Sequence, residues 1–236
     1  MITKDQNIAL LKVGNAALKK DEWVEYAYYC LEREKGLRKE AFKHLDNFLK
    51  STADWAEEQK IDFIKFLFQY FESVRDADYG PFPQPLSDKV IKPTLELWCE
   101  NEKNDSKPFR WYGKYYRSES HILKALEINS LDDKARQVLL NWWTYEIYYS
   151  VHHLPEGYIG NPNDDLELAN KIKEQINGLT EPKLRDHWIN ELEEDLELVK
   201  NYIQWKESGH PNLEIWGKEN NKRVSYGLTR IYYNEK

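Results

Sequence analysis

The segment PKLRDHWINELEEDLELVKNYIQW, residues 182–205, decides the fold class. Its apolar side chains recur at three- and four-residue spacing, which places them on one face of a helix. These side chains are Trp188, Leu192, Leu196, Val199 and Ile203. The positions between them are mostly charged, so the segment predicts a long amphipathic helix with one buried face. Thr180 and Pro182 suit the cap and the first turn of this helix.

The same spacing recurs along most of the 236 residues. Helices are predicted over about 4–19, 21–36, 37–49, 61–71, 87–100, 109–129 with a break near 118, 132–149, 166–176 and 180–205. Only 10 Gly and 9 Pro are present, so turns are few and the elements are long. We therefore predict an all-α protein, with antiparallel helix pairs stacked as an irregular bundle or a short α-solenoid.

Three segments carry finer expectations. The helix around 61–71 is apolar on most sides, which predicts burial at the centre of the N-terminal half. In the helix that starts at Asp132 or Asp133, the residues expected to face inward are Val138, Leu139, Trp142, Tyr145 and Tyr149. Near the end of the chain, Val224, Tyr226 and Leu228 alternate like a short strand.

Proline-rich and polar segments mark where the chain bends. Residues 79–85, YGPFPQP, hold three prolines and predict an extended loop, because proline lacks the amide hydrogen that a helix needs. Residues 101–107, NEKNDSK, predict a second loop. The chain is expected to form a single helical domain, 1–236. If it divides into two lobes, the expected lobes are 1–104 and 107–236.

Composition limits the kinds of partner. The net charge is −7, so a basic footprint for nucleic acid is not expected. The two cysteines, Cys30 and Cys99, lie within apolar helical patterns and are expected to be buried in a reducing compartment. The first residues lack the apolar stretch of a signal peptide, and no segment approaches the length of a membrane span. A cytoplasmic location without membrane contact is the expectation.

Motifs for common catalytic chemistry are missing from the sequence. It contains no HExxH, no GxSxG, no GxGxxG and no GxxxxGK[ST]. We therefore predict no catalytic residue, no bound metal and no cofactor, with one alternative that concerns a single loop.

That loop is HHLPEGYIGNPNDD, residues 152–165. Imidazole and carboxylate groups bind metals and carry protons, so it offers a metal or acid–base site. Its candidate residues are His152, His153, Glu156, Asp164 and Asp165, and the alternative function is a metal-dependent hydrolase. The loop is better explained as an ordered surface loop, in which His caps the preceding helix and Asp164 caps the next one.

Residues 125–135, ALEINSLDDKA, resemble the junction between two tetratricopeptide repeats. In those repeats a small residue packs where the helices cross, and a proline usually stands where this chain has Ser130. The resemblance spans about thirty residues, without a regular 34-residue period along the chain. It implies the packing style of stacked helical hairpins.

Acidic and aromatic residues indicate a protein partner. In ELEEDLE, residues 191–197, Leu192 and Leu196 are expected to face inward and the acids to face solvent. FRWYGKYYR, residues 109–117, interleaves aromatic and basic side chains, a pattern that fits single-stranded nucleic acid or a helix with buried aromatics. The acidic total favours the second interpretation. The predicted partner-binding residues are Glu191, Glu194, Asp195, Trp111 and Tyr115.

The leading hypothesis is therefore a non-catalytic protein-interaction module with a basic protein as its partner. In size, acidity and helical composition the chain is similar to bacterial immunity proteins that block partner toxins. That likeness implies that Glu191, Glu194 and Asp195 cover a cationic active site of the partner.

Overall fold

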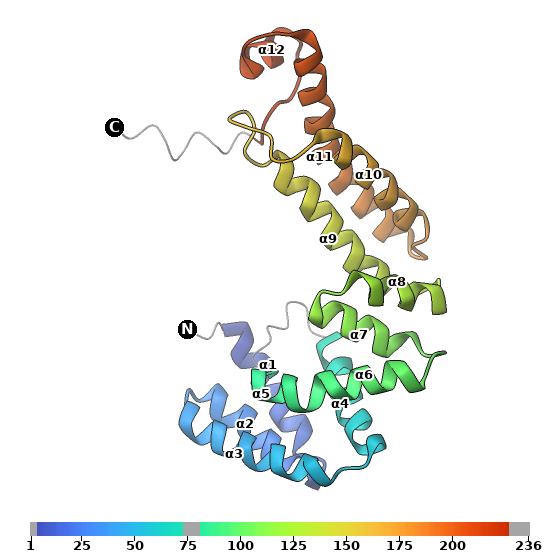
Figure 1. The fold of residues 1–236 in the computed structure, drawn as a ribbon. Coiled ribbons are helices and arrows are strands. Elements are labelled where there is room, and N and C mark those ends of the chain that lie inside the picture. The colour runs from blue at the N-terminus through green and yellow to red at the C-terminus, as the bar shows by residue number, and fades with distance from the viewer. Residues whose placement is uncertain (1–3, 73–80, 227–236) are drawn as a thin grey trace. The chain divides into compact units, whose positions relative to one another are not determined.

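The computed structural model describes residues 4–72 and 81–226 (Figure 1). These residues form helices and loops without a β-strand, so the predicted all-α class is confirmed. The strand expected near the C-terminus is not present in the described residues. Val224 and Tyr226 lie in an irregular segment, and Leu228 lies outside the described residues.

The chain divides into two compact units, Met1–Tyr116 and Arg117–Lys236. The division predicted at 104–107 is therefore about one helix too early. The reason is that the helix after this polar segment, α7 (Ser106–Tyr116), packs against α6 (Lys92–Asn101). Arg110 and Trp111 of α7 both donate hydrogen bonds to Glu72 of helix α4 (Glu57–Glu72), which ties α7 to the first unit.

The first unit is built from neighbouring helix pairs (Figure 1). Its other elements are α1 (Lys4–Ala17), η1 (Asp21–Trp23), α2 (Val24–Glu34), α3 (Arg38–Ser51), η2 (Thr52–Asp54), α4 (Glu57–Glu72), α5 (Gln84–Leu86) and η3 (Ser87–Ile91). Helix α1 packs against α2, α2 against α3, and α4 against α6. Gly36 has a φ of 79°, a conformation that favours glycine, and it lets the chain turn between α2 and α3 as predicted.

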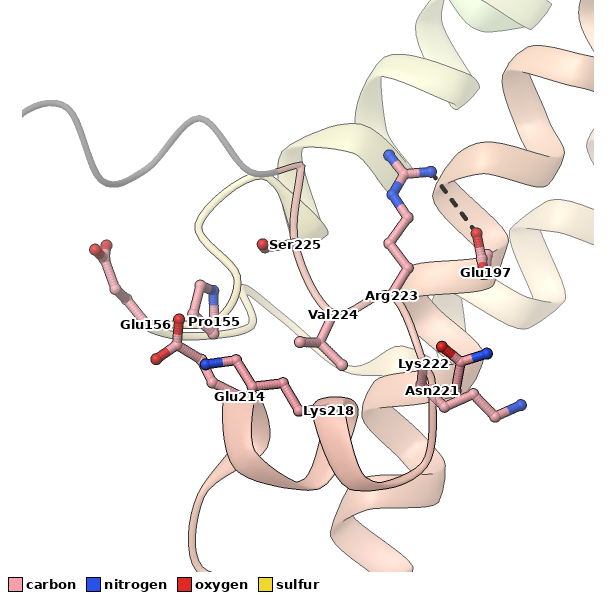
Figure 2. A pocket seen from close by; sticks show the side chains of 11 residues that line it. Pro155, Glu156, Glu197, Glu214, Lys218, Asn221, Lys222, Arg223, Val224 and Ser225 are labelled. Carbon is pink, nitrogen blue, oxygen red and sulfur yellow. Dashed lines mark ion pairs between the residues drawn. The ribbon is translucent and has the colours of Figure 1, made fainter.

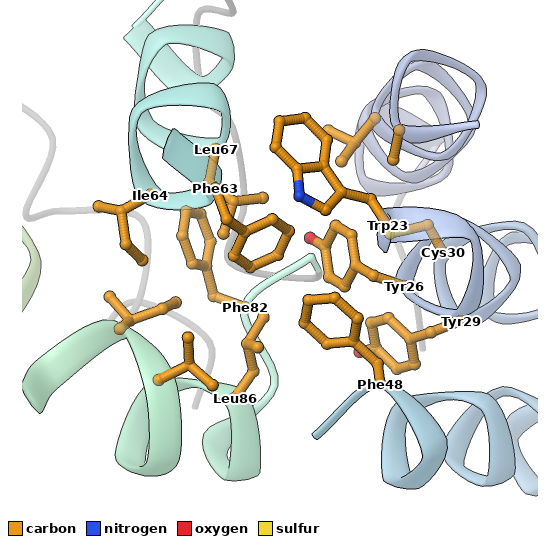
Figure 3. Close-up of a cluster of buried hydrophobic side chains, with 14 of the residues drawn as sticks. Trp23, Tyr26, Tyr29, Cys30, Phe48, Phe63, Ile64, Leu67, Phe82 and Leu86 are labelled. Atoms are coloured by element: carbon orange, nitrogen blue, oxygen red, sulfur yellow. The ribbon is translucent and has the colours of Figure 1, made fainter. Parts of the chain in front are cut away.

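Aromatic rings fill the core of the first unit, and Phe63 of α4 lies among them (Figure 3). Its ring centroid is 4.9 Å from that of Phe48, 5.0 Å from Tyr26 and 5.6 Å from Trp23. The central place predicted for this helix is confirmed. Both cysteines are buried, as expected, and burial raises the pKa of each thiol to about 12. They are therefore unreactive at neutral pH.

The second unit is built around three long helices. Its elements are α8 (Glu119–Ile128), α9 (Asp133–Val151), α10 (Pro162–Asn177), α11 (Pro182–Ser208) and α12 (Leu213–Glu219). Helices α9, α10 and α11 pack against one another, α8 packs on α9, and α12 packs on α11 (Figure 1). The carboxylate of Asp132 accepts a hydrogen bond from the amide of Ala135, which is the predicted cap of α9.

Two further features fix the ends of α11. The amide and hydroxyl of Thr180 donate to the carboxylate of Asp133, so the start of α11 is held at the start of α9. Gly209, with a φ of 67°, ends the helix. Among the helices within residues 4–72 and 81–226, none has the length and apolar character that crossing a membrane requires.

Candidate functional site

Tyrosines of α9 lie on the protein surface. Tyr145 is 60% exposed and Tyr149 is 50% exposed, and Tyr148 is exposed as well. The prediction that Tyr145 and Tyr149 face inward is therefore wrong. Two apolar stripes run along α9, and the one that packs against the neighbouring helices has four-residue spacing. It consists of Leu139, Trp143, Ile147 and Val151.

The exposed tyrosines form a row of rings in contact, with Tyr148 at its centre. The ring centroid of Tyr148 is 5.9 Å from that of Tyr145, 5.5 Å from that of His152 and 5.6 Å from that of Tyr226. Three segments of the second unit thus contribute to one aromatic surface. Such rings present electron-rich faces to a ligand.

Asp195 of α11 lies beside this row and is only 8% exposed. The expectation that every acid of the 191–197 run faces solvent is wrong for this residue. It is three positions after Leu192 and four before Val199, so the helix turns it towards the packed side. The hydroxyl of Tyr226 donates a hydrogen bond to its carboxylate.

Burial raises the pKa of Asp195 to about 6. The Tyr226 hydrogen bond opposes this shift, the charges of Glu191 and Glu194 add to it, and Arg223 opposes it. Asp195 is therefore largely ionised at neutral pH at a cost in free energy. A buried acid held in its charged form is a feature that functional sites share with structural ion-pair networks.

A cavity of about 410 Å³, here called the α9–α11 pocket, joins the tyrosines to the acids. Its lining residues are Asn141, Thr144, Tyr145, Tyr148, His187, Trp188, Glu191, Glu194, Asp195 and Tyr226. None of the described residues that line it is Lys or Arg. Glu191 and Glu194 are exposed, and neither forms an ion pair with a residue in the described part of the chain. The pocket is therefore acidic and has aromatic walls.

The irregular segment 221–226 places Tyr226 in this pocket. The side-chain amide of Asn201 donates to the carbonyl oxygen of Arg223 over 2.7 Å. The Arg223 guanidinium pairs with Glu197 at 3.7 Å and lies 5.1 Å from the ring centroid of Tyr226. Tyr226 is therefore held in place by two contacts, the hydrogen bond to Asp195 of α11 and the contact with Arg223 of its own segment.

A larger cavity of about 950 Å³ is lined in part by residues 221–225 of the same segment (Figure 2). Its lining mixes acids with bases: Glu156, Glu197 and Glu214 with Lys218, Lys222 and Arg223. Figure 2 shows Arg223 directed at Glu197, so part of this charge is already neutralised. The cavity therefore favours no single class of ligand.

The histidines of the 152–165 loop have structural roles. Nδ1 of His152 lies 2.7 Å from the carbonyl oxygen of Tyr149, and because a carbonyl only accepts, the imidazole donates. His152 thus caps α9, as the surface-loop interpretation predicted. The ring of His153 lies against that of His152, with ring centroids 4.0 Å apart.

The carboxylates of the same loop lie apart from these histidines. Asp165 is buried and accepts a hydrogen bond from the hydroxyl of Tyr158. Asp164 is exposed and accepts from the side chain of Asn161, which is itself the cap of α10, so the cap predicted for Asp164 is wrong. Glu156 faces the larger cavity. Across 4–72 and 81–226, no three His, Cys, Asp or Glu side chains gather as a metal site would require.

Trp111 and Tyr115, the other predicted partner contacts, lie in the first unit. Trp111 is 2% exposed and stacks on Phe68, with ring centroids 5.2 Å apart. Tyr115 is half-buried, 5.1 Å from Phe82 between ring centroids. Trp111 is therefore unavailable to a partner, because α7 turns its aromatic face towards α4 and the 81–83 segment.

Some pocket residues were missed by the sequence reasoning. His187, which was missed, stands one helical turn before the predicted Glu191 on α11, so both lie on one face, and this spacing is a usable signal. Tyr226 follows α11 by many residues and carries no such signal. Comparison of the chain with family models, curated proteins and solved structures found no match. The function is therefore inferred from the geometry of the second unit.

Proposed function

We propose that this chain is a non-catalytic protein-interaction module that binds a basic protein through the α9–α11 pocket and the acids around it. The observation that carries the proposal is one concave site that combines exposed tyrosines with Glu191 and Glu194, two carboxylates that form no ion pair within residues 4–72 and 81–226. Tyrosine is a frequent anchor of protein interfaces, and complementary charge accelerates encounter and fixes orientation.

The charge around the pocket supports a basic partner. Five of the seven residues in 191–197 are acids, and none is basic. The whole chain carries a net charge of −7, which repels acidic partners and attracts basic ones. An immunity-type inhibitor of a basic partner is the form of this function that the size, acidity and helical composition favour.

Charge reversal tests the proposal. Lysates of the cells that produce this protein are passed over the immobilised wild-type chain, over the pair variant Glu191→Lys with Glu194→Lys, and over Glu193→Lys. Glu193 is an exposed acid on the same helix that does not line the pocket, so it is the matched control. We expect a basic protein on the wild type and on the control, with retention that falls as salt rises, and none on the pair variant.

Two results would contradict the proposal. One is equal capture by the wild type and the pair variant, with both chains folded by circular dichroism. The other is the absence of any basic protein from the wild-type column, whether or not acidic proteins are retained. The captured protein is then purified and mixed with the wild-type chain, where the proposal expects a stoichiometric complex on gel filtration.

A further inference from the structure

We propose that the α9–α11 pocket accepts the guanidinium group of an arginine side chain. The inference rests on the proposed function and adds the chemical group that the pocket recognises in the partner. It follows from the shape of the pocket, its aromatic walls, its carboxylates and one buried donor.

Size and shape come first. The pocket measures about 410 Å³, within the range of sites that enclose small ligands and too large for a bare metal ion. Its walls come from two packed helices, α9 and α11, and from Tyr226. A site built on helices holds its side chains in defined positions, which suits a planar group.

The aromatic walls favour a guanidinium over an ammonium group. Tyr148 lies between Tyr145 and Tyr226, in contact with both rings. A planar guanidinium can stack on such faces and is less strongly hydrated than an ammonium group. The chain already contains this contact at the same ring, since the guanidinium of Arg223 lies 5.1 Å from the centroid of Tyr226.

The carboxylates of Glu191 and Glu194 supply the hydrogen-bond acceptors that a guanidinium group requires. Glu191 and Glu194 are three residues apart on α11, so both point to one side of the helix. Two like charges at this spacing repel each other, and no cation of the described chain pairs with either. A guanidinium carries five N–H donors in a fixed fork, so it can donate to both carboxylates at once.

Trp188 adds an observation that is independent of charge. It lines the pocket, it is only 7% exposed, and its indole Nε1 has no hydrogen-bond partner in the described part of the chain. A buried donor without an acceptor is costly, and because this nitrogen is closed off from solvent, a ligand oxygen reaches it only if the indole ring rotates. An arginine within a peptide brings backbone carbonyl oxygens together with its cation, whereas a metal ion or a polyamine brings only charge.

The test uses defined probes and the full-length chain. The ¹⁵N-labelled protein is titrated with N-acetyl-arginine amide, with its neutral isostere N-acetyl-citrulline amide, and with N-acetyl-lysine amide. We expect saturable chemical-shift changes from arginine amide, centred on residues 141–148 and 187–195. Citrulline amide should give none, and lysine amide should bind about tenfold more weakly.

Variants with matched controls locate the binding. Glu194→Gln and Tyr148→Ala should each weaken arginine-amide binding by about tenfold, because each removes one half of the recognition. The control variants Glu193→Gln on α11 and Tyr28→Ala at an exposed tyrosine of the first unit change the same residue types outside the pocket, and they should leave binding unchanged.

Three results would overturn the inference: no saturable shift with arginine amide, equal binding of citrulline amide or lysine amide, or equal losses in the pocket and control variants. Failure here is separable from failure of the proposed function. If the pair variant still loses the basic partner while arginine amide does not bind, only the arginine inference fails. If arginine amide binds and no basic protein is captured, only the proposed function fails.

Discussion

Aromatic side chains form a buried core in the first unit of this molecule, whereas several of them are exposed along α9 of the second. Around Phe63 in the first unit, rings from α2, α3 and α4 meet one another and are excluded from solvent. Along α9 in the second unit, Tyr145, Tyr148 and Tyr149 are exposed although their rings also contact one another or His152. A high aromatic content therefore indicates a core in one helix and an exposed surface in another.

The difference follows from how the helices are covered. Helix α4 packs among aromatic partners from several elements, which bury Phe63, Ile64, Leu67 and Phe68 and partly bury Ile61, Phe66 and Tyr70. Helix α9 is covered by α10 and α11 along its Leu139–Trp143–Ile147–Val151 stripe, and its tyrosines fall beside that stripe. Tyrosine tolerates this position because its ring is apolar and its hydroxyl is solvated.

The largest expected effect on stability comes from removing a buried ring of the first unit. Phe63→Ala removes a fully buried ring that contacts Trp23, Tyr26 and Phe48, so we expect a loss of about 3–5 kcal/mol in the free energy of unfolding. Urea denaturation followed by circular dichroism measures it. A loss below about 1 kcal/mol would show that these rings do not form a packed core.

A second, opposite effect is expected beside the exposed tyrosines. Asp195→Asn keeps an acceptor for the Tyr226 hydroxyl and removes a buried charge, so it should stabilise the protein at neutral pH. The pKa of Asp195 rises from 3.8 in the unfolded chain to about 6 in the fold, so the gain is about 3 kcal/mol at most. Thermal unfolding of the wild type and the variant, at matched pH values, measures it.

The pH dependence of this gain has a definite sign. Between pH 4 and 6 the native Asp195 holds its proton after the unfolded chain has lost it, so its contribution to stability falls as pH rises through this window. Glu191, Glu194 and Arg223 face the same group in both proteins. The difference between variant and wild type should therefore be near zero at pH 4 and largest above pH 6. A difference independent of pH would contradict the burial of this charge.

An intermediate effect concerns the segment that places Tyr226 in the pocket. In Gly217→Ala, the added Cβ would lie 2.8 Å from Cγ1 of Val224 and 3.0 Å from the carbonyl oxygen of Lys222. The 221–226 segment must shift, and we expect its protection from hydrogen exchange to fall by about 1 kcal/mol. Unchanged exchange at Val224 and Tyr226 would show that this contact does not hold the segment.

The smallest expected effect on stability comes from removing an exposed ring of α9. Tyr148→Ala removes an exposed ring, so it should change the free energy of unfolding by less than about 0.5 kcal/mol, far below the loss for Phe63→Ala. The same variant should still weaken binding at the pocket. A loss near that of Phe63→Ala in urea denaturation would place Tyr148 in the core and remove it from the proposed surface.

Local patterns in the sequence predict the helices well and their surroundings less well. Gly36 and Asp132 mark helix ends through their own backbone and hydrogen-bonding chemistry, and the structure places helix ends at both. The burial of Asp195 was missed because its position lies at the edge of the apolar stripe of α11. Which neighbour covers that edge is a tertiary property.

The buried face of α9 and the boundary between the two units were predicted wrongly for a related reason. Two apolar stripes compete along α9, and the packing of α10 and α11 decides between them. The division after Tyr116 depends on hydrogen bonds from Arg110 and Trp111 to Glu72, which lies far away in the sequence. The α9–α11 pocket needs Tyr226 as well, so only three of its lining residues, Glu191, Glu194 and Asp195, were among the predicted contacts.

The most direct test of the central claim is site-specific photocrosslinking. A benzophenone amino acid replaces Tyr145 beside the pocket or, as the control, the exposed Tyr28 of the first unit, and each chain is irradiated in lysate of the cells that produce it. We expect the probe at Tyr145 to capture a basic protein and to lose this capture when Glu191 and Glu194 are both changed to Lys. The probe at Tyr28 should capture no such protein. Capture of that protein from Tyr28 alone, or capture from Tyr145 that survives charge reversal, would contradict it.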